Sequence, residues 1–448
     1  MKNFRLLTTR IKKLTNSKFL RNVAIVATGT AGAQAITMVF SPIITRLYGP
    51  EAFGLLGTFN ATLAIVTPIA ALTYPIAIVL PKNDEDAISL AKLSSLLAVI
   101  ITCIMVLVIL IFGEKISVLF SLQKITSLLL LIPLGMLFSA FHQIFEQWLI
   151  RKKKYQIKAK TAILQSLTLG SAKTGFGWFH PVGTTLVILA TFGHALHALM
   201  LWIGMKKNSY TFSWKFKDKK SEKKHAENLH NMLSLAKKHR DFPFFRAPQV
   251  TINALSQSLP VLMLASFFGP ASVGFYSLGK TVMGLPTNLI GKSVSDVFYP
   301  RITEAAHNNE DIFKLVLKAT MTLGIVGFIP FTIVMLFGPW LFSFVFGIEW
   351  VTAGEYARWM ALWIYFMFMN NPSVKTLPVL NAQGFHLIFT FFTIVIRLSA
   401  LSIGYFIYKD DIIAVMLYGI AGAMINIILI TIVLILSNQY NKRVSKNA

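Results

Sequence analysis

The sequence predicts an all-α polytopic membrane protein with twelve transmembrane helices, arranged as two six-helix lobes around a central cavity. Three observations support this prediction. Hydrophobic residues make up 55% of the 448 residues and charged residues only 14%, which is too little charge for an ordinary soluble surface. Apolar stretches of about 20 residues, the length that crosses the hydrocarbon core of a bilayer, recur along the chain. A short motif also occurs twice, at equivalent places in the two halves.

The repeated motif consists of an aromatic residue, Gly-Pro, and a second glycine four residues after the proline. It reads LYGPEAFG at residues 47–54 and FFGPASVG at residues 267–274. Each copy is followed by a helix-length apolar run that contains prolines and ends at one, Pro81 or Pro300. A repeat of this size in a membrane chain indicates two structurally similar lobes, an arrangement that is frequent among transporters.

The apolar stretches define the twelve expected spans. Their ranges are 22–46, 53–80, 88–112, 126–150, 157–178, 181–205, 244–268, 274–299, 312–337, 350–374, 384–408 and 412–437. The fifth span is the most polar, because it contains three lysines. It is retained because the basic segments 151–160 and 206–240 should lie on the same membrane face. An even number of crossings must therefore separate them.

The distribution of basic residues sets the expected topology. The net charge is +25, and Lys and Arg concentrate at the N-terminus, in 151–160, in 206–240 and at the C-terminus. Such an excess of Lys and Arg is typical of cytoplasmic loops. We therefore expect both termini in the cytoplasm, and we expect the basic loops to contact anionic membrane lipids rather than nucleic acid.

The same pattern divides the chain into an N-terminal lobe (1–205), a basic cytoplasmic linker (206–243) and a C-terminal lobe (244–448). Both copies of the motif start in the same orientation, so the lobes are expected to be parallel repeats related by an axis along the membrane normal. The linker also has an apolar stripe at helical spacing. Its residues are Leu229, Met232, Leu233 and Ala236. This stripe predicts an amphipathic helix that lies on the inner leaflet.

Two deep basic residues are the first candidates for a functional site. Ionisable residues at membrane depth are costly, so they usually face a protein or water-filled interior. Lys280 lies a turn or two inside the eighth predicted span, and Arg397 lies near the middle of the eleventh. We expect both to face the central cavity, where a positive lining would suit an anionic ligand such as a lipid diphosphate.

Five further charged residues are candidates for the functional site, but each of them can also be explained by a purely structural role. Lys292, Arg46 and Arg358 are candidate cavity cations, whereas Asp296 and Glu146 are candidate ion-coupling acids. Lys292 and Asp296 are four residues apart on one helix and can form a purely structural pair. Arg46, Arg358 and Glu146 lie near the ends of spans, where they can extend to the interface or form ion pairs.

The sequence offers no catalytic machinery. It has no Walker-type glycine-rich loop with Lys-Ser/Thr, which argues against ATP hydrolysis. His194 and His197 are three residues apart on the sixth span, but no carboxylate lies near them in sequence, so polar packing is favoured over metal ligation. The single Cys103 excludes an internal disulfide and a Cys-based metal site. We expect no cofactor, no metal and no enzymatic activity.

Several short stretches, most of them in the first eighty or so residues, also resemble a known family. Phe40-Ser41-Pro42, Arg46 to Gly54, Leu80-Pro81 and Phe298-Tyr299-Pro300 resemble bacterial polysaccharide (O-antigen type) flippases. These belong to the multidrug/oligosaccharidyl-lipid/polysaccharide (MOP) exporter superfamily. The resemblance implies alternating-access transport of an undecaprenyl-diphosphate-linked oligosaccharide to the outer leaflet of the bacterial inner membrane. It also implies, as pathway partners, a polymerase and a chain-length regulator.

Two other functions remain open at this stage. An ion-coupled multidrug or small-molecule antiporter of the same superfamily would favour intramembrane acids, whereas the deep charges here are mostly basic. An O-antigen polymerase or membrane glycosyltransferase would be expected to have a long outer loop or a cytoplasmic catalytic domain, and the expected topology provides neither. The flippase is therefore the leading hypothesis.

Overall fold

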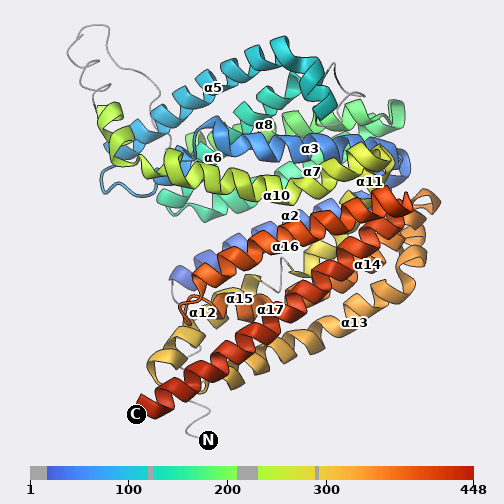
Figure 1. The fold of residues 1–448 in the computed structure, drawn as a ribbon. Helices are drawn as coiled ribbons and strands as arrows, with labels where there is room; N and C mark the ends of the chain where they lie inside the picture. Colours follow the sequence, from blue (N-terminus) through green and yellow to red (C-terminus); the bar gives the residue numbers. More distant parts are fainter. Residues whose placement is uncertain (1–17, 120–125, 127, 209–230, 288–291, 448) are drawn as a thin grey trace, which may run out of the picture. The chain divides into compact units, whose positions relative to one another are not determined.

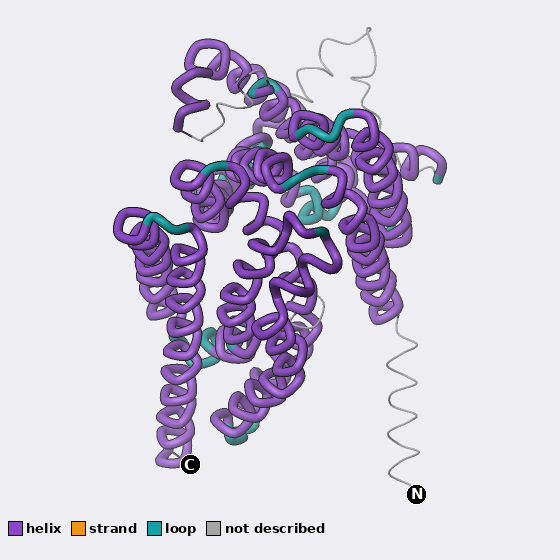
Figure 2. Tube along the Cα trace, turned by 90° about the vertical axis from the view of Figure 1, so that its right-hand side faces the viewer, coloured by secondary structure: helices purple, strands orange, loops and turns teal. Residues whose placement is uncertain are grey.

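The computed structural model describes residues 18–119, 126, 128–208, 231–287 and 292–447. Throughout these residues the regular elements are helices, and none of them forms a strand (Figure 2). The first half contains α2 (Lys18–Leu47), α3 (Pro50–Ala70), α4 (Tyr74–Ala77), α5 (Asp84–Leu119), α6 (Leu131–Arg151), α7 (Tyr155–Phe179) and α8 (Gly183–Lys207). The second contains α10 (Ala247–Phe268), α11 (Pro270–Pro286), α12 (Lys292–His307), α13 (Ile312–Phe346), α14 (Val351–Met369), α15 (Asn371–Thr376), α16 (Gln383–Ile403) and α17 (Asp411–Asn447). The prediction of an all-α protein is confirmed.

The chain forms two compact units. Unit 1 comprises Met1–Tyr48 and Thr58–Ser258, and unit 2 comprises Gly49–Gly57 and Leu259–Ala448. The division passes through two helices, α3 and α10. The first turns of α3, which carry most of the first motif copy, therefore belong to the same unit as the second copy.

Some of the predicted spans are not continuous helices. The range 53–80 is split between α3 and α4, because Leu72 and Thr73 take left-handed backbone angles (φ 48° and 58°) and Pro75 follows them. Proline lacks the N–H that would continue the ladder, so the helix restarts at α4. The range 274–299 contains the end of α11, at Pro286, and the first turns of α12, and residues 288–291 between them lie outside the described residues.

Seven helical segments of the described chain are long and apolar enough to cross a membrane. They are Pro50–Ala70, Asp84–Lys115, Gly183–Lys207, Phe242–Phe268, Ile312–Phe346, Gln383–Tyr408 and Asp411–Arg443. Helices also occupy the other predicted ranges, but they are shorter or more polar; α7, for example, carries the lysines of the fifth range. The layout of twelve crossings stays a prediction.

The described part of the linker packs against the core of unit 1. Residues 231–238 are helical, and Met232 and Leu235 are both only 4% exposed within a cluster that includes Ile78 and Trp148. The Tyr74 hydroxyl donates a hydrogen bond to the Ala236 carbonyl at 3.0 Å, which fixes the same contact.

The predicted position of this helix on the inner leaflet stays a prediction. Leu233 is 60% exposed, whereas Leu235, which the stripe omitted, is buried. Leu229 lies outside the described residues. The buried positions are set by where the core of unit 1 lies, and helical spacing alone does not locate that core.

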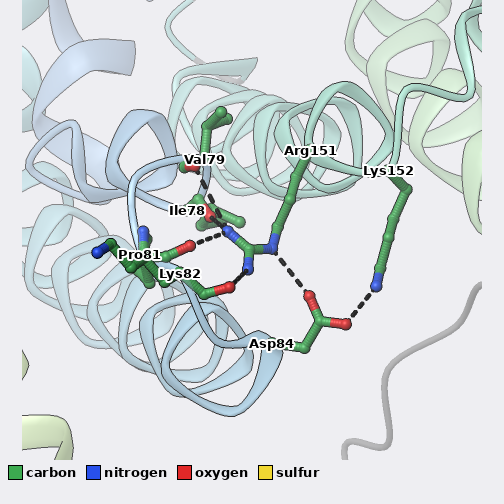
Figure 3. A network of polar contacts seen from close by, with 7 residues as sticks. All are labelled: Ile78, Val79, Pro81, Lys82, Asp84, Arg151 and Lys152. Atoms are coloured by element: carbon green, nitrogen blue, oxygen red, sulfur yellow. Dashed lines mark hydrogen bonds and ion pairs between the residues drawn. The ribbon is translucent and has the colours of Figure 1, made fainter.

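Arg151 connects α6 to the turn between α4 and α5 in unit 1 (Figure 3). Arg151, at the end of α6, donates hydrogen bonds to the carbonyls of Pro81 (2.5 Å) and Lys82 (3.2 Å) and pairs with Asp84 at 3.1 Å. Lys152 forms a second ion pair with the same carboxylate. The Arg151 side chain is only 10% exposed, so it holds the turn between α4 and α5 against α6 from a largely buried position.

In unit 2, α13, α14 and α17 run side by side (Figure 1). A core cluster joins α12, α13, α15 and α17 through residues that include Ile302, Val316, Leu377 and Val433.

The two copies of the repeated motif meet in unit 2. Pro50 begins α3 and Pro270 begins α11, a position that suits proline because the first helical N–H has no partner within the helix. A Cβ on Gly54 would lie 1.7 Å from the Pro270 carbonyl oxygen, and a Cβ on Gly274 would lie 2.0 Å from the Pro50 carbonyl oxygen. The contact is reciprocal, and only glycine permits it.

Candidate functional site

Arg397, on α16, lies against two aromatic rings of unit 2. Its guanidinium carbon is 3.7 Å from the centre of the Trp363 ring on α14 and 4.0 Å from the centre of the Tyr418 ring on α17. The two rings contact each other edge to face at 5.7 Å. Cation–π contacts at these distances position the guanidinium without neutralising its charge.

The polar edge of this guanidinium has unused hydrogen-bonding capacity. Nε and Nη2 of Arg397 are buried and have no hydrogen-bond partner among the described residues. Buried donors without acceptors are costly, and for a charged group the cost is larger. An acceptor-rich anion placed at this edge would satisfy both donors.

Lys280, on α11, is the second cation of this region. Its Nζ lies 6.0 Å from the centre of the Tyr276 ring, and Tyr276 in turn lies 6.5 Å from Tyr418. Lys280 is half-buried and close enough to Arg397 for the two charges to interact. Because like charges repel, this arrangement is improved by an anion between or beside them.

Trp363, Tyr418 and Tyr276 thus connect the two favoured cations. We call the group of Arg397, Lys280 and these three aromatic residues the Arg397 cluster. Sequence analysis did not single out any of the three aromatic residues. Aromatic residues are frequent in this chain, with 36 Phe, 12 Tyr and 8 Trp, so their types alone carry little information. Their role depends on the packing of four separate helices.

The other candidate cations have different surroundings. Arg358, on α14, forms an ion pair with Glu355 at 3.0 Å and also donates to the Leu336 carbonyl at 3.5 Å. Arg46 is exposed in the last turn of α2, where its charge suits the negative end of the helix dipole. Lys292 and Asp296 lie in the first turns of α12, and their side chains lie outside the part that the structure describes.

Glu146 belongs to a second polar region, within unit 1. It pairs with Lys158 of α7 at 2.5 Å, and His142 and His197 lie close enough for electrostatic interaction with it. The rings of His142 and His197 are 4.3 Å apart. The structure thus supplies the carboxylate that is absent from the sequence neighbourhood of His194 and His197.

These histidines line a cavity of about 630 Å³ inside unit 1. Its lining residues come from α3, α6, α7, α8 and α10: Asn60, Leu63, Ala64, Thr67, Pro68, Ser139, His142, Gln143, Gln165, Gly193, His194, His197, Val250 and Ala254. Within the described residues, no group of three or more His, Cys, Asp or Glu side chains is arranged to hold a metal ion. Sequence analysis missed this cavity, although the polar residues on three neighbouring spans could have indicated it.

Comparison with known proteins places the chain in a family. The family model described as "Polysaccharide biosynthesis protein" matches residues 43–355, well over half of the chain. The succinoglycan biosynthesis transport protein ExoT of Rhizobium meliloti (strain 1021) is 21% identical over 346 residues. That match covers 75% of this chain and 63% of the relative, so the chain spans less than two thirds of the relative's length.

Two solved structures of similar fold come from a multidrug transporter and a lipid flippase. An inward-facing multidrug resistance MATE family transporter of the MOP superfamily has a TM-score of 0.64 at 15% identity, covering 95% of this chain and 99% of that one. The lipid II flippase MurJ, in an inward closed conformation, has a TM-score of 0.64 at 13% identity, covering 91% and 86%. At these identities the likeness establishes the fold. The chain is therefore a multi-pass membrane protein of the polysaccharide biosynthesis protein family, with the fold of MOP-superfamily transporters.

Proposed function

We propose that this protein flips an undecaprenyl-diphosphate-linked oligosaccharide, such as an O-antigen or capsule repeat unit, from the inner to the outer leaflet of the bacterial cytoplasmic membrane. The observation that carries the proposal is the buried Arg397 guanidinium, which has two donors without an acceptor among the described residues and has Lys280 nearby. Family membership and the named succinoglycan transport relative support a saccharide as the cargo.

The chemistry of the Arg397 cluster suits a diphosphate. A planar guanidinium can donate two parallel hydrogen bonds to phosphate oxygens, and a lysine ammonium acts as a further point charge. The flanking rings of Trp363 and Tyr418 reduce water access, so the electrostatic attraction is stronger than at an open surface. The lipid chain can remain in the bilayer while the headgroup is held.

The proposed transport cycle is alternating access, in which two six-helix lobes (1–205 and 244–448), joined by the cytoplasmic linker, expose the site to one side of the membrane at a time. Twelve crossings with both termini in the cytoplasm belong to this proposal. The proposal also assigns Arg46, Arg358 and Lys292 as further cations that contact the substrate. Glu146 and Asp296 are the proposed ion-coupling acids, and no enzymatic activity is required of the chain. A polymerase and a chain-length regulator are proposed to act on the same glycan.

A flipping assay with purified protein tests the proposal. Proteoliposomes are loaded with a defined undecaprenyl-diphosphate oligosaccharide, and its arrival in the opposite leaflet is followed with an impermeant lectin. Losing a charged hydrogen bond costs about 1.5–3 kcal/mol, so Arg397→Ala should lower the rate at least about tenfold. Lys318→Ala, which removes an exposed cation from α13, is the matched control. Normal rates in both Arg397→Ala and Lys280→Ala would refute the role of the cluster.

One observation favours a second candidate function: the MATE family neighbour of similar fold is a multidrug resistance transporter. An organic cation would, however, be repelled by Arg397 and Lys280, because like charges in a low-dielectric site interact strongly. Ethidium efflux from the same proteoliposomes distinguishes the two functions. Efflux that survives Arg397→Ala, without glycan flipping by the wild-type protein, would establish the antiporter instead.

A further inference from the structure

The lining of the cavity of unit 1 combines apolar surface with polar side chains that carry no permanent charge. None of its lining residues is Asp, Glu, Lys or Arg. Neutral groups that both donate and accept hydrogen bonds dominate its polar part: the amides of Asn60, Gln143 and Gln165 and the hydroxyl of Ser139. This composition differs from that of the Arg397 cluster, and it suits a ligand rich in neutral hydroxyl groups.

The charges at the edge of the cavity neutralise each other. Glu146 lies one helical turn beyond His142 on α6, and it is paired with Lys158 at 2.5 Å. A carboxylate held in this way contributes little net charge to the cavity. An organic cation would find no free acid in the lining, and a phosphate would find no guanidinium or ammonium group there.

Several polar atoms of the cavity are available to a ligand. His197 Nε2 is buried and has no hydrogen-bond partner among the described residues. The Thr67 hydroxyl donates to the Leu63 carbonyl at 2.7 Å, which leaves its oxygen able to accept. Planar amides and imidazoles suit neighbouring hydroxyl groups, because they present a donor and an acceptor at a fixed spacing.

The apolar part of the lining completes the site. Leu63, Ala64, Pro68, Val250 and Ala254 supply aliphatic surface on α3 and α10. A pyranose ring has C–H faces that pack against such a surface and an equatorial rim of hydroxyl groups. The volume of about 630 Å³ lies within the range of about 300–1,000 Å³ that is usual for small-molecule sites, and it exceeds the volume of one hexose.

From this geometry we infer that the cavity of unit 1 is a saccharide subsite, in which Gln143, Gln165 and His197 hydrogen-bond the hydroxyl groups of a neutral sugar residue of the transported glycan. The inference rests on the proposed flippase function and deepens it. Phosphate recognition by the Arg397 cluster and sugar recognition by this cavity are assigned to different helices and to different chemistry. Glycan selectivity would then depend on the neutral side chains of unit 1.

Saturation-transfer NMR on the full-length protein in lipid nanodiscs tests this subsite. The probes are glucose, galactose, rhamnose and N-acetylglucosamine, each at millimolar concentration. We expect saturation transfer to at least one sugar, reduced at least threefold in Gln143→Leu and in Gln165→Leu. Gln147→Leu is the matched control, because it lies one turn from Gln143 on α6 and does not line the cavity.

The possible results separate this inference from the proposed function. Absence of transfer to all four sugars, or transfer that neither Gln143→Leu nor Gln165→Leu reduces, overturns the subsite even if the protein flips lipid-linked glycan. Conversely, sugar binding that depends on both glutamines supports the subsite, and a failed flipping assay would then count against the proposed function alone. Correct folding of each variant is checked by its elution volume and thermal transition in the same nanodiscs.

Discussion

Gly54 of α3 and Gly274 of α11 lie at one helix crossing, and each is placed against the carbonyl oxygen of the proline that begins the other's helix. The two copies of the repeated motif are therefore in direct contact with each other, in addition to being alike in sequence. Because each glycine accommodates the other helix's first turn, the motif has a structural explanation that does not require it to bind a ligand.

Substitution at this crossing should destabilise unit 2. A Cβ at either glycine would overlap a backbone oxygen, which cannot move without shifting a whole helix. We expect Gly54→Ala and Gly274→Ala each to lower the free energy of unfolding by about 1–3 kcal/mol, the range for overpacked sites. Thermal unfolding in detergent measures the loss.

The matched control is Gly384→Ala in α16, where a Cβ would meet nothing within 4 Å. This change should be neutral or slightly stabilising, because alanine is the better helix former. If Gly54→Ala unfolded at the same temperature as Gly384→Ala, the close crossing would be disproved.

The buried Arg151 should be important for the stability of unit 1. Arg151→Ala would leave Asp84 with only Lys152 as an ion-pair partner and would leave the Pro81 and Lys82 carbonyls without their donor. We expect the free energy of unfolding to fall by about 2–4 kcal/mol. The remaining groups would stay largely buried without the hydrogen bonds and the ion pair that offset the cost of their desolvation.

Lys153→Ala serves as the control for Arg151→Ala, because it removes a cation from the same turn but an exposed one. Both variants lose one positive charge, so any difference in thermal unfolding reports the network rather than the charge. Equal unfolding temperatures would contradict the structural role of Arg151.

Neighbouring leucines of the linker offer an internally controlled comparison. Leu235 is 4% exposed and Leu233 is 60% exposed. Leu235→Ala should cost about 2–4 kcal/mol through lost burial and a residual cavity, whereas Leu233→Ala should have little effect. Limited trypsin digestion, followed at the lysines and arginine of 237–240, should become faster only in Leu235→Ala. Equal digestion rates in the two variants would show that the linker is not docked on the core.

The aromatic partners of Arg397 should affect substrate binding in a graded way. A buried cation–π contact contributes about 1–2 kcal/mol, so Trp363→Leu should raise the apparent KM for lipid-linked glycan roughly tenfold. Trp363→Phe keeps an aromatic face and should retain part of the affinity. Trp340→Leu, at an exposed position on α13, is the control. An unchanged KM in Trp363→Leu would show that the ring does not position the guanidinium for substrate.

The turn between α12 and α13 should loosen in acid. Arg301 lowers the pKa of Glu310 through a hydrogen bond, and the Lys314 backbone N–H lowers the pKa of Asp311, which caps α13. Both pKa values are depressed in the folded state, so their stabilisation is present at neutral pH. It is lost as the pH falls below about 4, the ordinary carboxyl range, through the folded values.

Hydrogen exchange of amides 312–316, corrected for the intrinsic rate at each pH, measures this loosening. Protection should fall between pH 6 and pH 3 in the wild-type protein. Asp311→Asn removes one of the two titrating groups, so it should show a smaller change with pH. An identical pH response in this variant would argue against Asp311 as the responsible group.

The sequence by itself determined the class of this protein. Long apolar stretches with few charges must be helices in a bilayer, since a helix satisfies its backbone hydrogen bonds within the segment. Helices occupy the described parts of the predicted ranges apart from the interruptions given above, and the membrane depth of Lys280 and Arg397 is a prediction from their position in those stretches. The duplicated motif was visible for the same reason, because a repeat is a property of the chain.

Only the tertiary structure decided which side chains meet. Trp363 and Tyr418 reach Arg397 from different helices, and the cavity of unit 1 takes its polar side chains from four. The contact between Gly54 and Gly274 likewise joins two segments that are distant in sequence. Local periodicity fixes the face on which a residue lies within its own helix. The partner on that face depends on how helices pack against one another, and one sequence on its own contains no direct record of that packing.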